Sequence, residues 1–383
     1  MALPSGHLDK LIAALDPEKA GDIAGFVRDA VRAVPRHLFV PAVGLVAPDD
    51  GEPRLIDHDT DPDAWWDAIA STQPIITQLD DGATPLTTLK GSYTSSSSSP
   101  ATVADLLNHL APEPGMRVLE IGTGTGWTAG LLSHLVGDEN VTSIEVDATV
   151  AEQAGKNLAA AEHQPALLVG DGAKGCPDRA PYDRVHVTCG IRHVPYAWVE
   201  QCRPGAVIVL PWHPGFGASH ALRLEVREDG TAQGRVVGGA AYMMMRSQRL
   251  RPDEKQPQEE TRRYWTALDP RALDALSAGA DLAIGALTGL VTHTESGADD
   301  DGAWLCVWVS DPDEAGRWAS VTWRPDRAVH AVRQVGDRPV WDEVLLAYAR
   351  WVGWGEPHWR RYGVTVTPEG QRVWLDTPDN VIG

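Results

Sequence analysis

Apolar positions recur along the chain at two spacings, and their order predicts an α/β fold. Short continuous apolar runs of the kind found in buried strands occur at 118–121, 141–146, 166–169, 184–188 and 206–210. Stretches with apolar residues three and four apart separate them, at 127–136 and 150–161. Strands that alternate with helices are typical of a mostly parallel sheet. The pairs 222–226 and 235–237, around a turn at Asp229, predict an antiparallel edge.

The first 45 residues predict two short amphipathic helices, at 8–15 and 23–31, and Pro35 ends the second. The segment that follows, VPRHLFVP at 34–41, predicts an ordered connector whose apolar side chains pack against the rest of the protein. Residues 47–70 are acidic and rich in turn residues, which favours a solvated loop.

Four aspartates at 57–63 alternate in that acidic stretch as the first ligands of a calcium loop would. Pro62 occupies the position where such a loop needs glycine, and Ala68 the position of its glutamate. We therefore expect no calcium site.

Five serines at 95–99 precede Pro100 and a helical pattern at 103–110. Ser99 is a natural N-cap, and Pro100 is a natural first helical residue. Capping explains only the last serine. The four before it precede the central strand and are candidates for the same pocket.

The polar stretch 249–260 contains two prolines and no apolar period, so it predicts a linker. Residues 1–248 then form an N-terminal helical segment and the main α/β domain. Residues 261–383 predict a smaller α+β domain that recognises substrate or stabilises the fold, with a tryptophan-rich helix near 340–352 and a final hairpin at 364–375.

The stretch RVLEIGTGTG at 117–126 indicates a ligand site. It joins a buried strand to a helix through three glycines, which permit positive φ and close approach of a ligand. The third glycine comes one residue too early for a nicotinamide fingerprint. Acids stand at three strand ends, as Glu120, Glu145 and Asp171. A ligand with a cationic amino-acid tail and a ribose fits acids there, which favours S-adenosylmethionine.

Composition narrows the classes of function. The formal net charge of −20 argues against a nucleic-acid partner, because binding to phosphates depends on Lys and Arg. The 4 cysteines form no C-x-x-C pair and have no nearby histidine at ligand spacing, so we expect no metal site. The chain shows no signal peptide and no apolar run near membrane-spanning length, so we expect a cytoplasmic protein with no membrane partner.

The chain resembles the protein-L-isoaspartate O-methyltransferases over roughly residues 20–245. The resemblance rests on these motifs and residues: VPRHLFVP at 34–41, VLEIGTGTG at 118–126, Glu145, GDG at 170–172 and VTCG at 187–190. The resemblance implies a class I S-adenosylmethionine-dependent methyltransferase: a Rossmann-like, mostly parallel sheet, followed here by the smaller α+β domain. S-adenosylhomocysteine would be the product of the cofactor.

The resemblance also implies roles for individual residues. The set around the methionine part of the cofactor would be Glu120, Gly122, Thr123, Gly124 and Gly126. Glu145 would bind the ribose hydroxyls, Asp171 and Gly172 would lie near the adenine, and Thr188 would flank the cleft.

The acceptor side departs from the family pattern. The family usually carries T-I-S-Q-P before the helix, and this chain reads SSSSP at 96–100, which aligns the active-site serine with Ser98. Ser97 is the alternative register. Because a carboxylate is already nucleophilic at pH 7, a serine would serve to orient it by hydrogen bonds and no strong base is needed.

The C-terminal region resembles that of actinobacterial family members found beside lanthipeptide, lasso-peptide and graspetide pathways, through WDEV at 341–344, VTVTP at 364–368 and GQRVWLD at 370–376. This implies methylation of an aspartate side chain in a modified macrocyclic precursor peptide, leading to aspartimide and then isoaspartate. The alternatives are a repair-type protein-L-isoaspartate O-methyltransferase, a small-molecule methyltransferase and an inactive peptide-binding module.

Overall fold

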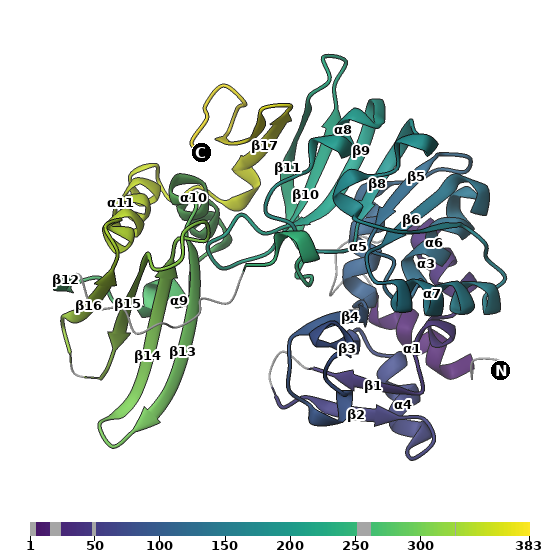
Figure 1. Ribbon diagram of the computed structural model, residues 1–383, viewed down its shortest axis with the longest axis horizontal. Coiled ribbons are helices and arrows are strands. Elements are labelled where there is room, and N and C mark those ends of the chain that lie inside the picture. Colours follow the sequence, from purple (N-terminus) through teal and green to yellow (C-terminus); the bar gives the residue numbers. More distant parts are fainter. Residues whose placement is uncertain (1–4, 16–23, 48–50, 251–261, 326) are drawn as a thin grey trace.

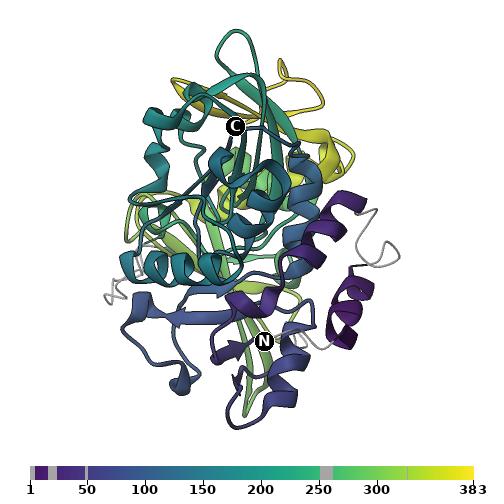
Figure 2. The same ribbon diagram turned by 90° about the vertical axis from the view of Figure 1, so that its right-hand side faces the viewer.

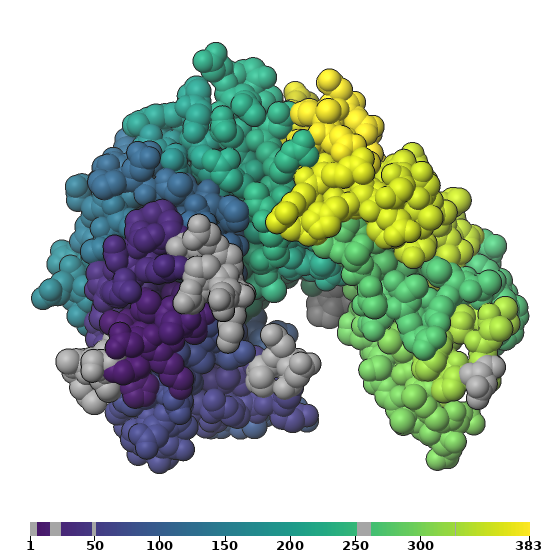
Figure 3. Space-filling view, turned by 180° about the vertical axis from the view of Figure 1, so that it is seen from behind, coloured from purple at the N-terminus to yellow at the C-terminus, as the bar shows by residue number. Residues whose placement is uncertain are grey.

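The computed structural model describes residues 5–15, 24–47, 51–250, 262–325 and 327–383. The described residues form three separate β-sheets, of nine, four and five strands. The nine-stranded sheet is central, and the two smaller sheets lie on either side of an open hollow (Figures 1 and 3). The predicted linker at 249–260 lies outside the described residues from 251 onward.

The central sheet has the order β18-β17-β11-β10-β9-β8-β5-β6-β7. Its strands are β5 (Val118–Ile121), β6 (Val141–Glu145), β7 (Ala166–Val169), β8 (Tyr182–Val187), β9 (Cys202–Trp212), β10 (His220–Val226), β11 (Ala232–Gly239), β17 (Tyr362–Thr367) and β18 (Gly370–Leu375). The strands from β9 to β7 are parallel, and those from β9 to β18 are antiparallel. The predicted parallel core and antiparallel edge are therefore both observed.

Helices cover both faces of this sheet. They are α1 (Ser5–Ala14), α3 (Gly25–Ala33), α5 (Pro100–Leu110), α6 (Trp127–Val136), α7 (Ala148–Ala160) and α8 (Tyr196–Glu200). One core joins α1, α3, α5 and α6 to Val118, Val141 and Val207. The N-terminal helices α1 and α3, purple in Figure 2, lie against each other. Helix α3 also contacts α5 and α6. The second core, on the other face, includes Trp198 of α8.

The acidic stretch expected to be a solvated loop belongs to a folded four-stranded sheet, so that prediction is wrong. The elements are β1 (Val43–Val46), β2 (Arg54–Asp57), α4 (Pro62–Ile69), β3 (Ile75–Leu79) and β4 (Tyr93–Ser97). Asp61 caps α4 by accepting from the Ala64 amide at 3.0 Å. Trp65 and Trp66 are buried, and this apolar burial outweighs the surrounding charge.

The C-terminal region forms the five-stranded antiparallel sheet, in the order β12-β16-β15-β14-β13. Its elements are β12 (Arg262–Thr266), α9 (Arg271–Asp274), α10 (Ala278–Thr288), β13 (Val291–Asp299), β14 (Gly302–Ser310), β15 (Trp318–Trp323), β16 (His330–Val335) and α11 (Val340–Gly353). A buried contact ties it to the central sheet, where His220 Nε2 on β10 lies 3.0 Å from Asp281 Oδ2 on α10.

The final hairpin differs from its expected place in the second domain. It forms at β17 and β18, but β17 pairs with β11 and so extends the central sheet. The burial of Tyr362, Val364 and Val366 in the core beneath that sheet explains the placement. The chain thus leaves the main domain near residue 250 and returns to it at 362.

Candidate active site

One large cavity, of about 710 Å³, opens at the carboxyl ends of the parallel strands. Seven segments of the chain line it: strand β3, strand β4 with its following serines, the turn after β5, the end of β6, the turn after β7, the residues after β8, and a segment at 241–249. In open α/β sheets ligands bind at this edge. Its position and size suit a nucleoside-sized ligand together with an acceptor.

The glycine turn takes the shape that its sequence predicts. Gly122 and Gly124 both have positive φ, of 95° and 55°. A Cβ on Gly122 would lie 2.7 Å from Thr188 Oγ1, and one on Gly124 would lie 3.3 Å from the Ser96 carbonyl oxygen. Thr188 Oγ1 donates to the Ile121 carbonyl at 2.9 Å, which fastens the turn to the next strand. The turn therefore packs directly against the serine segment.

Glu145 ends β6 at the cavity wall, where the prediction places a group for ribose hydroxyls. Its Oε2 accepts from the Gly124 amide at 2.9 Å, and its Oε1 accepts from the Asp147 amide at 3.0 Å. The carboxylate is held in one orientation by two backbone donors. Lone pairs remain on both oxygens for further donors.

Asp171 and Gly172, in the turn after the neighbouring strand β7, also line the cavity, where the resemblance predicts the adenine. Asp171 Oδ1 accepts from the Ala173 amide at 3.0 Å and so shapes a short turn. The Gly172 carbonyl accepts from Trp198 Nε1 at 2.8 Å, which ties that turn to the core. Three carboxylates, of Glu145, Asp147 and Asp171, line the cavity together with the guanidinium groups of Arg246 and Arg249.

Two of the residues expected around the cofactor do not line the cavity. Glu120 is 0% exposed beneath the turn, where its Oε2 accepts from Ser143 Oγ at 2.5 Å. Burial raises the pKa of Glu120 to about 8. Thr123 Oγ1, 2.6 Å from Ser143 Oγ, extends this chain of hydrogen bonds to the cavity wall. Glu120 therefore supports the turn from below.

Gly126 is also outside the lining, contrary to its expected role. It is the N-cap of α6 with φ 91°, and a Cβ there would lie 3.3 Å from atoms of Ala154 and Leu158 on α7. Its place in the sequence reflects close helix packing. The remaining predicted residues Gly122, Thr123, Gly124, Glu145, Asp171, Gly172 and Thr188 all line the cavity.

The serine run divides among three tasks. Ser99 caps α5 by accepting from the Thr102 amide at 3.5 Å, as predicted. Ser98 lines the cavity. Ser97 is 1% exposed, and its Oγ accepts from Arg36 Nε at 3.3 Å, away from the cavity. Of the two serines considered for the acceptor carboxylate, only Ser98 lines the cavity.

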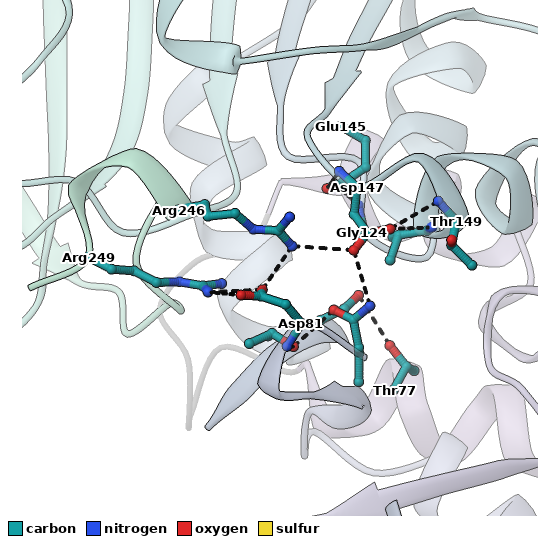
Figure 4. Close-up of polar contacts among 12 residues, drawn as sticks. Thr77, Asp81, Gly124, Glu145, Asp147, Thr149, Arg246 and Arg249 are labelled. Atoms are coloured by element: carbon teal, nitrogen blue, oxygen red, sulfur yellow. Dashed lines mark hydrogen bonds and ion pairs between the residues drawn. The ribbon is translucent and has the colours of Figure 1, made fainter. Parts of the chain in front are cut away.

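Segment 241–249, which the sequence patterns did not predict as part of the site, forms the wall facing the four-stranded sheet. Arg246 Nη2 lies 2.8 Å from Asp81 Oδ1 and 3.3 Å from Asp147 Oδ2, and Arg249 Nη1 lies 2.8 Å from Asp81 Oδ2 (Figure 4). Gln78 Nε2 also donates to Asp147 Oδ2, at 3.3 Å. These ion pairs join three parts of the chain across the cavity. No local sequence pattern at 241–249 predicts these ion pairs.

Other polar groups of the lining are held neutral. Burial raises the pKa of the Cys189 thiol to about 12 and also raises the pKa of the Tyr242 phenol. A neutral thiol is a poor nucleophile. Within the described ranges, no cluster of His, Cys, Asp and Glu is arranged to hold a metal ion, and no helix is long and apolar enough to cross a membrane.

Known proteins share sequence similarity with the part of the chain that forms this cavity. The profile of the family described as Protein-L-isoaspartate(D-aspartate) O-methyltransferase (PCMT) matches residues 73–250. The protein of that name from Pyrococcus abyssi is 37% identical over 147 residues, which are 38% of this chain and 68% of the relative. The chain belongs to the protein-L-isoaspartate O-methyltransferase family. The family predicted from the sequence is thereby confirmed.

Other matches show how far the likeness extends. The Pyrococcus horikoshii relative of the same name is 39% identical over 151 residues, so the chain spans about two thirds of the relative, 66%. A solved protein-L-isoaspartate O-methyltransferase structure aligns with 97% of this chain and 100% of its own, at 20% identity and a TM-score of 0.51. The predicted class I S-adenosylmethionine-dependent methyltransferase fold is confirmed, with an additional β-rich C-terminal region. S-adenosylmethionine is the cofactor of this fold, and the donor side of the cavity fits it.

Proposed function

We propose that this protein is an S-adenosylmethionine-dependent carboxyl O-methyltransferase that acts on polypeptides. One observation carries the proposal: a single cavity contains both the glycine turn with Glu145 and the serine Ser98. A donor site and an acceptor site that share a cavity permit direct transfer between bound partners.

The chemistry needs little from the protein beyond orientation. The cofactor supplies a methyl group on a sulfonium, which the acceptor carboxylate attacks in line, so that a C–O bond forms as the S–C bond breaks. The positive sulfonium and the negative carboxylate are both neutralised, which a dry cavity favours. In this scheme Glu145 binds the ribose, Asp171 and Gly172 flank the adenine, and the Ser98 hydroxyl donates to the acceptor carboxylate.

The first candidate substrate is an isoaspartyl residue, because the matching relatives carry that name. Its methyl ester is attacked by the following backbone amide nitrogen, which expels methanol and gives a succinimide. The second candidate is an ordinary aspartate side chain in a modified macrocyclic peptide. It is supported by the acceptor side, where Ser96–Ser99 replace the segment usual in the family and line the cavity at Ser96, Ser98 and Ser99.

Three peptides of one sequence distinguish these readings: one with isoaspartate, one with aspartate, and the aspartate peptide closed into a macrocycle. Methyl transfer from labelled cofactor is measured as base-labile methanol. We expect transfer to the isoaspartyl peptide, and preference for the macrocycle would establish the second candidate. The variant S98A should transfer methyl at a much lower but still measurable rate, whereas S296A, at an exposed serine of β13, should transfer at the wild-type rate.

Other results would reject the proposal. Cofactor binding by calorimetry without transfer to any of the three peptides would indicate a peptide-binding module. Transfer to a free metabolite with none to peptides would indicate a small-molecule methyltransferase.

A further inference from the structure

Arg36, in the motif VPRHLFVP at 34–41, makes contacts that cofactor binding does not explain. It begins a short 3₁₀ helix, Arg36–Phe39, yet it is only 2% exposed. Its guanidinium donates six hydrogen bonds, all to neutral oxygens of the serine segment, the last residue of α4 and the loop before β3. The acceptors are Ser97 Oγ at 3.3 Å and the carbonyls of Ile69 at 3.2 Å, Ser71 at 3.2 Å, Gln73 at 2.9 Å, Ser97 at 3.2 Å and Ser98 at 3.1 Å.

Burying a guanidinium costs free energy of hydration, so a buried arginine indicates a specific structural role. Burial lowers the pKa of Arg36 to about 9, since a cation loses hydration there. The fork of donors recovers this loss only if every carbonyl stays in place. The loop before β3 and the end of β4 are thus held at fixed positions around one side chain. A lysine, with a single ammonium, cannot reach all six acceptors.

The hydrogen bonds to the serines decide which hydroxyl faces the cavity. Arg36 binds the hydroxyl and carbonyl of Ser97 and the carbonyl of Ser98. Adjacent side chains of an extended strand point to opposite sides. With Ser97 turned toward Arg36, Ser98 is directed into the cavity lining.

Arg36 also contacts the donor side. Its guanidinium carbon lies 5.6 Å from the centroid of the Trp127 ring, and Trp127 is the first residue of α6 after the glycine turn. Trp127 Nε1 donates to the Val34 carbonyl at 3.1 Å, two residues before Arg36. One side chain therefore touches both the helix that follows the donor turn and the segment that carries the acceptor serine.

We infer that Arg36 is a positioning residue that fixes the Ser98 hydroxyl relative to the glycine turn without touching the substrate. The inference rests on the proposed function, since Ser98 matters only if a carboxylate is oriented there. Loss of the Arg36 contacts should therefore reduce the rate of transfer more than it reduces affinity for the cofactor.

Two variants test this. R36K keeps a long basic side chain and removes the fork of donors, whereas S97A removes a single one of the six hydrogen bonds and leaves the rest. R32K is the matched control, because Arg32 is half exposed on α3 and pairs only locally with Asp29. For each variant, kcat and KM with the preferred peptide, the cofactor Kd by calorimetry and the Tm are measured.

We expect R36K to lower kcat by about tenfold to a hundredfold and S97A by a smaller factor, with the cofactor Kd within about twofold of wild type. In the S98A background, R36K should lower kcat no further, because its effect acts through Ser98. Amide hydrogen exchange in residues 97–102 should rise in R36K, a readout independent of turnover.

The inference is overturned if R36K and S97A both keep the wild-type kcat, or if R36K costs as much in S98A as in wild type. If R36K does not fold, S97A alone and the S97A/S98A pair decide by the same comparison. A wild-type protein that transfers methyl to no peptide would instead reject the proposed function, so the two failures are distinguishable.

Discussion

The buried carboxyl of Glu120 makes the stability of this protein depend on pH in a direction that can be calculated. Burial raises its pKa from 4.5 to about 8, so the folded protein keeps this proton across the neutral range. The unfolded chain releases it above pH 4.5. Between these values the unfolded state binds fewer protons, and stability falls as pH rises. The loss is at most about 1.4 kcal/mol per pH unit, and about 5 kcal/mol in total.

The variant E120Q removes the titration and keeps a group that Ser143 can hydrogen-bond. Thermal unfolding at pH 5, 6.5 and 8 measures the effect, with E228Q, at an exposed glutamate, as the control. Relative to E120Q, the wild-type Tm should fall by about 5–10 °C from pH 5 to pH 8. Wild-type and E120Q profiles that run parallel would refute the reasoning, because Glu120 would then be ionised alike in both states.

Three further predictions concern the cavity and its frame. D81N removes the partner shared by Arg246 and Arg249. Because these pairs are partly exposed, we expect release of S-adenosylhomocysteine to be only about twofold to fivefold faster. Stopped-flow rates that match wild type would mean that the pairs with Asp81 do not help to retain the bound cofactor. G122A places a methyl group against Thr188 at positive φ and should weaken cofactor binding at least about tenfold by calorimetry, whereas G170A, with nothing within 4 Å, should not. G363A forces a Cβ against Trp374 in the final hairpin and should lower the Tm, and an unchanged Tm would mean that this hairpin does not stabilise the central sheet.

Local patterns predicted the centre of the molecule well. The strand, glycine turn and helix at 118–136 appear as β5, the turn and α6, and Ser99 caps α5 as expected. Capping, positive φ at glycine and helical spacing depend on residues only a few positions apart, so the sequence carries them directly.

Contacts between distant residues could not be predicted in the same way. Residues 51–70 of the acidic stretch fold because Trp65 and Trp66 pack into a hydrophobic core, which no count of charges predicts. Tyr362 and its neighbours return the chain end to β11, more than a hundred residues away. Arg246 reaches Asp81 and Asp147 only because three parts of the chain meet at the cavity.

Ser97 and Ser98 illustrate the difference between what local sequence patterns predict and what contacts between distant residues decide. The sequence by itself determined the family, the fold, the glycine turn and a serine segment beside it. It aligned the active-site serine with Ser98 but kept Ser97 as the alternative register, since both stand in one run of identical residues. Only the tertiary structure decided between them: Arg36, 61 residues before Ser97, binds that hydroxyl in the interior. A buried cation must satisfy its donors with whatever the fold brings near, and that requirement acts through space.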